Sequence, residues 1–184
     1  FNASRATVIS RGFFCIMKDE KSICRNEWMK RMEKKRLIME TPLGHLAIEG
    51  ENKAITAVYF TNEELLQTNE KLLQRAQKQL QEYFAGERRA FDLPLLLTGT
   101  PFQLAAWEAL QQIPYGEMWT YGQQAKRMGF PNASRAVGGA NHKNPIAIII
   151  PCHRVVSKNG LGGYAMGKEK KRFLLELEAG IIRF

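Results

Sequence analysis

The sequence has few of the features that mark membrane-spanning, secreted or disordered proteins. Its apolar runs stay well below the ~18 residues that a membrane-spanning helix needs, and no small-residue cleavage pattern follows a suitable apolar segment. It contains three cysteines, whose spacing matches no disulfide framework. With hydrophobic residues at 45% and charged residues at 24%, the composition predicts a globular protein of the cytoplasm, where a free thiol can persist.

Acidic residues are in the minority, but the positive excess is unevenly distributed. The net charge is +9, of which residues 1–36 and residues 100–184 carry +6 each, whereas residues 37–99 carry −3. A basic C-terminal part suits contacts with phosphate groups. Charge alone is weak evidence for nucleic-acid binding, because many solvated surfaces carry a similar excess.

The pattern of apolar residues divides the chain into three parts. Residues 1–36 show neither a helical nor a strand period, and we expect a leader that packs loosely or has no fixed structure. Residues 37–98 are expected to form an N-terminal α/β domain and its linker. Three short runs up to Phe60 predict an antiparallel sheet, and apolar positions from Leu65 onward predict a helix that stops at Gly86. Residues 99–184 are expected to form a mostly helical C-terminal domain.

The starts of the C-terminal helices are marked in the sequence. Thr100-Pro101-Phe102-Gln103 and Thr120-Tyr121-Gly122-Gln123 each match a capping box, in which threonine and glutamine side chains satisfy the first backbone N–H groups. Asn132 is expected to cap a third helix that ends near His142. A tight turn with glycine and proline joins the second and third of these helices, which predicts a helix-turn-helix.

The third of these helices has an unusual outer face. At about 100° per residue, two sets of side chains fall on opposite sides of it. These are Ala133, Ala136, Val137 and Ala140 on one side, and Arg135, Gly138, Gly139 and His142 on the other. Each glycine costs roughly 1 kcal/mol of helix stability relative to alanine. Close approach of another backbone would explain the adjacent glycines, and a solvated face with packing glycines is the alternative.

One cysteine stands apart from the others. Ile146-Ala147-Ile148-Ile149-Ile150 predicts a buried strand, which Pro151 ends. Cys152 is therefore expected at a strand end, directly before His153 and Arg154. Imidazole and guanidinium groups favour the thiolate form of a thiol whose reference pKa is about 8.5. The pattern favours a reactive cysteine over the alternative, a small buried hydrophobe.

Further motifs accompany this one in order along residues 100–180. They are Thr100-Pro101-Phe102-Gln103, Ile113-Pro114-Tyr115-Gly116-Glu117, Thr120-Tyr121-Gly122, Ser134-Arg135-Ala136-Val137-Gly138, Asn144-Pro145-Ile146, Pro151-Cys152-His153-Arg154-Val155, Gly162-Gly163-Tyr164 and Leu174-Leu175-Glu176-Leu177-Glu178-Ala179-Gly180. Together they resemble the O6-alkylguanine-DNA alkyltransferases, or methylated-DNA–protein-cysteine methyltransferases. The resemblance implies an α/β protein. Its small N-terminal domain would be ribonuclease H-like, and its C-terminal domain would be winged-helix-like with a helix-turn-helix.

The resemblance also assigns catalytic roles. Cys152 would attack the alkyl carbon and become a thioether, and His153 would take the thiol proton through a water. Glu178 would orient the imidazole ring and stabilise its protonated form. Tyr121 would protonate the departing guanine ring, and Asn144 would brace the turn before the active-site segment. The implied reaction is single-turnover, irreversible DNA repair.

The same resemblance implies how DNA is held. Arg135 would fill the stack that a flipped nucleotide leaves, while small neighbours let its helix enter the minor groove. The implied DNA contacts are Ser134, Arg135, Gly138 and Tyr121, and the implied pocket residues are Pro145, Tyr164, Ala165 and Met166. Met166 departs from the family pattern, and its bulk at the pocket rim puts tolerance of larger alkyl groups in question.

The implied substrate is double-stranded DNA that contains O6-alkylguanine, with O4-alkylthymine as a further candidate. No cofactor, no metal and no membrane contact are expected, and the protein is expected to be a monomer. Cys15 and Cys24 form a C-x8-C pair with only His45 as a distant third ligand. A non-catalytic binder of alkylated DNA is the main alternative. A cysteine hydrolase and a transcription factor are disfavoured, because the histidine adjoins the cysteine and the helix face lacks base-reading side chains.

Overall fold

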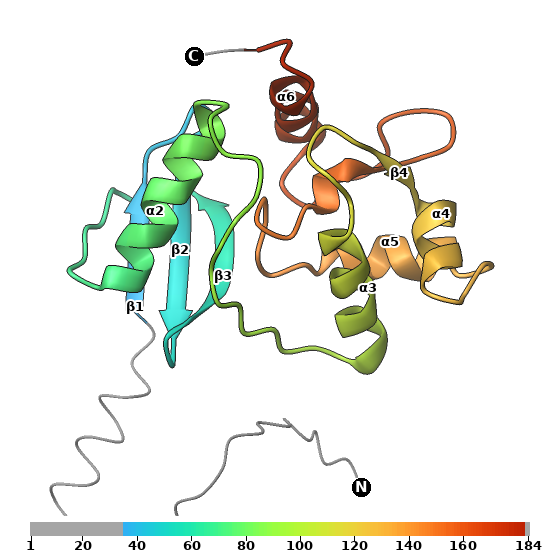
Figure 1. Cartoon of the computed structure of the whole chain (residues 1–184), viewed down its shortest axis with the longest axis horizontal. Helices are drawn as coiled ribbons and strands as arrows, with labels where there is room; N and C mark the ends of the chain where they lie inside the picture. Colours follow the sequence, from blue (N-terminus) through green and yellow to red (C-terminus); the bar gives the residue numbers. More distant parts are fainter. Residues whose placement is uncertain (1–34, 183–184) are drawn as a thin grey trace, which may run out of the picture. The chain divides into compact units, whose positions relative to one another are not determined.

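The computed structural model describes residues 35–182, and its N-terminal domain is built on a three-stranded sheet. The strands β1 (Lys35–Met39), β2 (His45–Glu51) and β3 (Ala54–Thr61) are antiparallel and lie in the order β1-β2-β3 (Figure 1). The predicted sheet is confirmed. Strand β1 begins at Lys35, two residues before the expected start, and the remainder of the predicted leader lies outside the described residues.

Helix α2 (Lys71–Phe84) packs against this sheet (Figure 1). Its buried stripe includes Leu73, Ala76 and Leu80, which share one core with the apolar residues of the strands. The helix ends at Phe84, and Gly86 follows with a φ of 77°, a left-handed conformation that favours glycine. The predicted helix is therefore confirmed at its C-terminal end.

The segment before α2 is extended, although its apolar residues predict a helix from about Leu65. Leu66 and Ile38 of β1 exchange two backbone hydrogen bonds, with N···O distances of 2.8 and 3.2 Å. The side chains of Leu65 and Leu66 are 50% and 44% exposed, so they form no buried helical stripe. Backbone pairing at the edge of the sheet decides the conformation here, and the predicted helix start is wrong.

In the described C-terminal residues, four α-helices carry the domain: α3 (Pro101–Gln111), α4 (Tyr121–Arg127), α5 (Ser134–His142) and α6 (Lys168–Glu178). Both predicted capping boxes are confirmed, at the starts of α3 and α4. Helices α4 and α5 pack together across a short turn and form the expected helix-turn-helix. The predicted cap of α5 is wrong, because Ala133 occupies the N-cap position and no side chain caps the helix.

The apolar run before Cys152 is buried, but it is not a strand. Only Ile146 makes a strand-like bridge, to Val58 of β3, and residues 147–149 form a turn. Ile148 has a φ of 70°, which is strained for a β-branched side chain. The predicted strand is therefore wrong: burial was read correctly from the composition, but apolar residues alone do not distinguish a buried strand from a buried turn.

Cys152 opens a short 3₁₀ helix instead of closing a strand. This helix, η1 (Cys152–Arg154), leads into β5 (Val155–Val156), which pairs in parallel with β4 (Trp119–Thr120). The turn ahead of η1 is held from the N-terminal domain. Val58 donates to the carbonyl of Pro145 and accepts from Ala147, both at 2.9 Å. The segment that leads to Cys152 is thus anchored to the N-terminal sheet by backbone hydrogen bonds.

Candidate functional site

Cys152 lies in a small pocket at the junction of α4, α5 and the loop before α6. The pocket has a volume of about 60 Å³. Its lining residues are Tyr121, Gly138, Asn141, His142, Cys152, Gly163, Tyr164 and Ala165. The cysteine itself is only 7% exposed. Five of the predicted site residues therefore meet in one cavity: Cys152, Tyr121, Gly138, Tyr164 and Ala165.

The side chain of Asn144 makes a hydrogen bond to Cys152. Its side-chain nitrogen donates to the Cys152 sulfur at 3.1 Å and to the Ile150 carbonyl at 2.8 Å. Its side-chain oxygen accepts from the backbone N–H of Ile146 at 3.1 Å. One buried amide thus ties together both ends of the turn before η1, and it also contacts the Cys152 sulfur.

Burial disfavours the thiolate form of Cys152. Burial raises the pKa of Cys152 above its ordinary value, against the hydrogen bond from Asn144 and the charge of Lys171. Arg154, which was expected to favour the thiolate, points away and donates to Glu178 and to the Ile113 carbonyl. The prediction of a lowered thiol pKa is therefore wrong, because desolvation outweighs the nearby positive charge.

His153 and Glu178 form a buried pair next to the thiol. The Nε2 atom of His153 lies 2.8 Å from Oε1 of Glu178, and both side chains are at most 1% exposed. Burial lowers the pKa of His153, against its hydrogen bond with Glu178, so the ring is neutral at neutral pH. Because a carboxylate can only accept, Nε2 carries the proton. Nδ1 is then a free acceptor, and it is buried without a hydrogen-bond partner among the described residues.

Glu178 stays ionised although it is buried. Burial opposes its ionisation, but hydrogen bonds and charges from His153 and Arg154 outweigh that effect and lower the pKa of Glu178 to about 2. Arg154 donates to both carboxylate oxygens, at 2.8 and 3.0 Å. Two more donors complete the shell: the backbone N–H of Gly116 at 3.1 Å and the Tyr83 hydroxyl at 2.7 Å. Sequence reasoning missed these last two, since nothing local marks them as partners of a distant carboxylate.

Lys171 is a further residue near the pocket that the sequence does not reveal. Its side chain is fully buried and donates to the carbonyls of Val155 at 2.6 Å and Gly163 at 3.0 Å. Burial lowers its pKa to about 8, although the charge of Cys152 acts in the opposite direction. The lysine joins β5 to the loop that lines the pocket. Within a run of five charged residues at the start of α6, it looks like an ordinary solvated side chain.

Two tyrosines, Tyr121 and Tyr164, line the pocket. The Tyr121 hydroxyl donates to the Gly163 carbonyl at 3.3 Å, and burial raises the pKa of Tyr121. Burial, together with the charges of Cys152 and Glu178, raises the pKa of Tyr164 well above its ordinary value. The Tyr164 hydroxyl is buried without a partner among the described residues. Both phenols therefore remain protonated at neutral pH.

Helix α5 presents its small-residue face outward from the pocket rim. Arg135, Gly139 and His142 are exposed, whereas Val137, Ala140 and Asn141 are buried. Ala136, expected on the buried side, is exposed instead. A Cβ atom placed on Gly139 would meet nothing within 4 Å, and one on Gly138 would touch the Tyr121 ring at 3.7 Å.

Buried polar contacts fix the position of α5. Gln124 of α4 and Asn141 exchange amide hydrogen bonds at 2.7 and 3.1 Å. The Trp107 indole of α3 donates to the Ala140 carbonyl at 2.9 Å. The helix that carries Arg135 is thus held at its C-terminal end, next to the pocket, by satisfied hydrogen bonds.

Other predicted residues lie near the pocket without lining it. The Pro145 carbonyl accepts from Val58, and Met166 packs against the hydrophobic core. Ser134 is half-buried at the start of α5. Asn141, His142 and Gly163 also line the pocket. They were not predicted as site residues, because nothing in the local sequence distinguishes them from their neighbours.

The part of the chain that the structure describes offers no group of three or more His, Cys, Asp and Glu side chains suited to a metal ion. The Nδ1 atom of His45 lies 2.6 Å from the Glu63 carbonyl oxygen. Cys15 and Cys24 fall outside the described residues. None of the helices between residues 35 and 182 combines the length and apolar character needed to cross a membrane.

Two family descriptions together cover most of the chain. "6-O-methylguanine DNA methyltransferase, ribonuclease-like domain" matches residues 34–97. "6-O-methylguanine DNA methyltransferase, DNA binding domain" matches residues 101–180. The match therefore follows the two halves of the described fold.

Individual relatives agree with these descriptions. The methylated-DNA–protein-cysteine methyltransferase of Methanosarcina acetivorans is 48% identical over 156 residues, which cover 77% of this chain and 96% of the relative. The constitutive enzyme of the same name from Bacillus subtilis is 48% identical over 151 residues, or 76% and 92% of the two chains. The crystal structure of Mycobacterium tuberculosis OGT in complex with DNA has a TM-score of 0.72 and 43% identity, over 79% of this chain and 93% of that one.

Proposed function

Since the chain belongs to the 6-O-methylguanine DNA methyltransferase family, whose members repair alkylated DNA directly, we propose that Cys152 is its alkyl acceptor. One observation carries the assignment. The Cys152 sulfur lines a pocket directly beside the buried pair of His153 and Glu178. The chemistry is irreversible transfer from O6-alkylguanine in double-stranded DNA, with one turnover per molecule, because the thioether formed on Cys152 is stable and does not return the free thiol.

The proton on the thiol is the first obstacle to transfer. The free Nδ1 atom of His153 is the acceptor for this proton, through a water, and Glu178 stabilises the imidazolium that results. The sulfur then attacks the alkyl carbon. A C–S bond forms and the bond from carbon to the guanine O6 breaks. Tyr121, still protonated, donates to the guanine ring and later recovers a proton from His153 through solvent.

Access to the substrate requires a flipped base. The O6 atom of a paired guanine lies inside the duplex, so the nucleotide leaves the stack at a cost of a few kcal/mol. Arg135 is exposed on α5 and makes no hydrogen bond or ion pair with another described residue, which supports its role as the group that fills the gap. Ser134 and Gly138 lie on the same helix and are proposed to contact DNA with it.

The remaining assignments follow from this chemistry. Pro145 and Met166 are proposed to shape the pocket from behind, with Tyr164 and Ala165 at its wall. A division near residue 98 separates the N-terminal domain from the DNA-binding domain. We place the working protein in the cytoplasm, because its thiol has to remain reduced. It is proposed to act as a monomer.

Transfer to an oligonucleotide substrate tests the proposed function. The protein is incubated with duplex DNA that contains O6-methylguanine, and the added methyl group is located by peptide mass spectrometry. One methyl group per molecule, on Cys152, is the expected result. Tight binding without transfer would instead identify a non-catalytic binder of alkylated DNA.

Arg135→Ala is expected to slow repair of duplex DNA by roughly a hundredfold, because the flipped state loses a few kcal/mol of support. Reaction with free O6-benzylguanine needs no flipping and should change by less than about twofold. Lys78→Ala is the matched control, since it removes one exposed positive charge from α2, away from the pocket. Equal losses with both substrates would refute the role of Arg135.

Gly139→Ala should separate stability from DNA binding. Alanine in an open helical position should add about 1 kcal/mol of stability and raise the melting temperature by roughly 2–4 °C. The added methyl group occupies the space in which DNA approaches α5. Duplex repair should therefore slow by roughly tenfold, the equivalent of about 1.4 kcal/mol. Unchanged duplex repair would show that this face stays away from DNA.

A further inference from the structure

The Oε1 atom of Glu178 receives hydrogen bonds from two domains. Within the C-terminal domain, His153 and Arg154 reach it at 2.8 and 3.0 Å. From the N-terminal domain, the Tyr83 hydroxyl reaches the same atom at 2.7 Å. The shortest of the three bonds is therefore made by a residue outside the DNA-binding domain.

Tyr83 is held firmly in this position. It lies in the last turn of α2 and is fully buried. Its ring makes edge contacts with Phe84 and Tyr115, at centroid distances of 5.5 and 6.1 Å, and a tilted contact with Phe91 at 5.5 Å. These ring contacts do not involve the hydroxyl. Removal of the hydroxyl alone should thus leave the packing of α2 intact.

We infer that Tyr83 is a positioning residue for the transfer reaction, through which the N-terminal domain sets the strength of the Glu178–His153 hydrogen bond. The inference rests on the proposed function of Cys152 and extends it to the ribonuclease-like domain. A residue at this position has no contact with the alkyl group. It acts through the carboxylate that it holds.

The physical effect follows from the sharing of one oxygen. A donor on Oε1 withdraws electron density from the bond that the same atom makes with His153, and it fixes the direction of the carboxylate. Without the Tyr83 hydroxyl, Oε1 becomes a stronger acceptor for His153. The imidazolium form is then stabilised, and the pKa of His153 rises.

Several other groups face this pair, and Tyr83→Phe leaves all of them in place. Arg154 of η1 and Lys171 of α6 oppose the positive charge on His153. Cys152 adjoins His153 in the chain, and Tyr115 and Tyr164 lie within electrostatic reach of Glu178. The direction of the change therefore depends on the lost hydroxyl alone.

Tyr83→Phe is tested by the pH dependence of single-turnover transfer to Cys152, from about pH 5 to about pH 9. The acidic limb of the profile is expected to move upward by about half to one pH unit, the effect of one hydrogen bond on a charged partner. At pH values below the pKa of His153, transfer should fall by roughly three- to tenfold, and it should recover at higher pH. NMR titration of the His153 ring in the same variant should show an upward shift in pKa of the same size.

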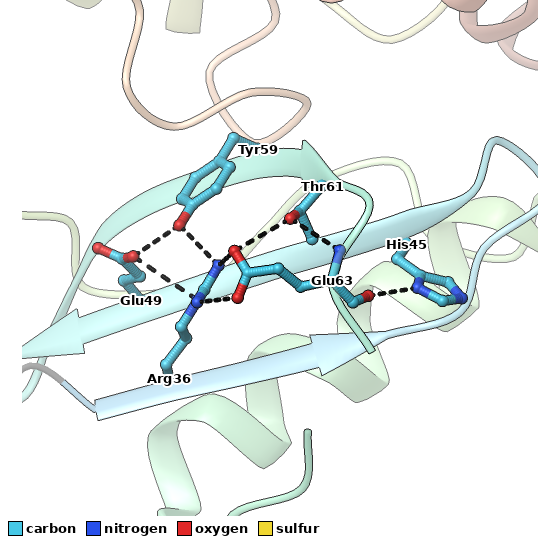
Figure 2. A network of polar contacts seen from close by, with 6 residues as sticks. All are labelled: Arg36, His45, Glu49, Tyr59, Thr61 and Glu63. Atoms are coloured by element: carbon cyan, nitrogen blue, oxygen red, sulfur yellow. Dashed lines mark hydrogen bonds and ion pairs between the residues drawn. The ribbon is translucent and has the colours of Figure 1, made fainter. Parts of the chain in front are cut away.

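Tyr59→Phe is the matched control. Its hydroxyl donates to the carboxylate of Glu49 at 2.8 Å in the same domain, within the network around Arg36 on the sheet (Figure 2). It therefore removes an equivalent tyrosine–carboxylate bond without touching Glu178. Its pH profile and the titration of His153 should match those of the unmodified protein.

The possible outcomes distinguish the role of Tyr83 from the proposed function of Cys152. A Tyr83→Phe profile that keeps its acidic limb, or that falls by one constant factor at every pH, overturns the inference, since general loosening moves no pKa. The NMR titration decides the same question even where transfer is slow. Absence of methyl on Cys152 in the unmodified protein would instead overturn the proposed function itself.

Discussion

Cys152→Ser is expected to abolish methyl transfer, with a loss of more than about a thousandfold. A serine hydroxyl is a much weaker nucleophile than a thiolate, and a neutral imidazole next to it does not compensate for this in an alkyl transfer. The change is otherwise conservative, because Asn144 can donate to the new oxygen as it does to the sulfur. Stability should therefore change by no more than about 1 kcal/mol.

Binding provides the control for this prediction. The variant should bind duplex DNA with O6-methylguanine as well as the unmodified protein does, because Arg135 and the face of α5 are unchanged. Gel-shift titration measures the affinity, and mass spectrometry measures the transfer. Residual methylation of the protein at another residue would show that Cys152 is not the sole acceptor.

Glu178→Gln is expected to reduce both the rate of transfer and the stability. The imidazolium of His153 loses its negative partner, so the rate should fall by roughly 10²–10⁴. Arg154 is left as a buried charge without a carboxylate, which should cost about 3–5 kcal/mol of unfolding free energy. Single-turnover kinetics and denaturant titration measure the two effects.

The pH dependence of stability provides a second test of the same variant. The pKa of Glu178 is lowered from an ordinary value of 4.5 to about 2, so its ionisation stabilises the fold above pH 4.5. That contribution is lost as the pH falls from 4.5 through about 2 in the unmodified protein. Glu178→Gln should lack this part of the acid dependence, and an unchanged acid limb would contradict the assigned pKa.

Local signals in the sequence predicted those features that depend on neighbouring residues. The capping boxes of α3 and α4 consist of residues three apart, and both form as expected. The three strands of the sheet follow from alternating residues and turns. Cys152, Tyr121 and Tyr164 were placed by the resemblance of their motifs, and all three line one pocket.

The errors have a common physical cause, which is contact between distant parts of the chain. The start of α2 was missed because Leu66 pairs with β1, and the turn at Ile148 was mistaken for a strand because both conformations bury isoleucine. Cys152 was expected to favour the thiolate, but burial raises the pKa of its thiol, and Arg154 turns toward Glu178, a partner 24 residues away. Periodicity and composition reflect residues that are close in the sequence, so they do not predict contacts between distant segments.

The hydrogen bonds from β3 to the turn before Cys152 affect how the protein unfolds. Family descriptions divide the chain between residues 97 and 101, which suggests two modules that could be separated. Yet Val58 holds Pro145 and Ala147 across that division. The two domains are therefore expected to unfold cooperatively, although they are separate in the sequence. Loss of the sheet would also release the segment before Cys152, and the described residues should unfold as a single unit.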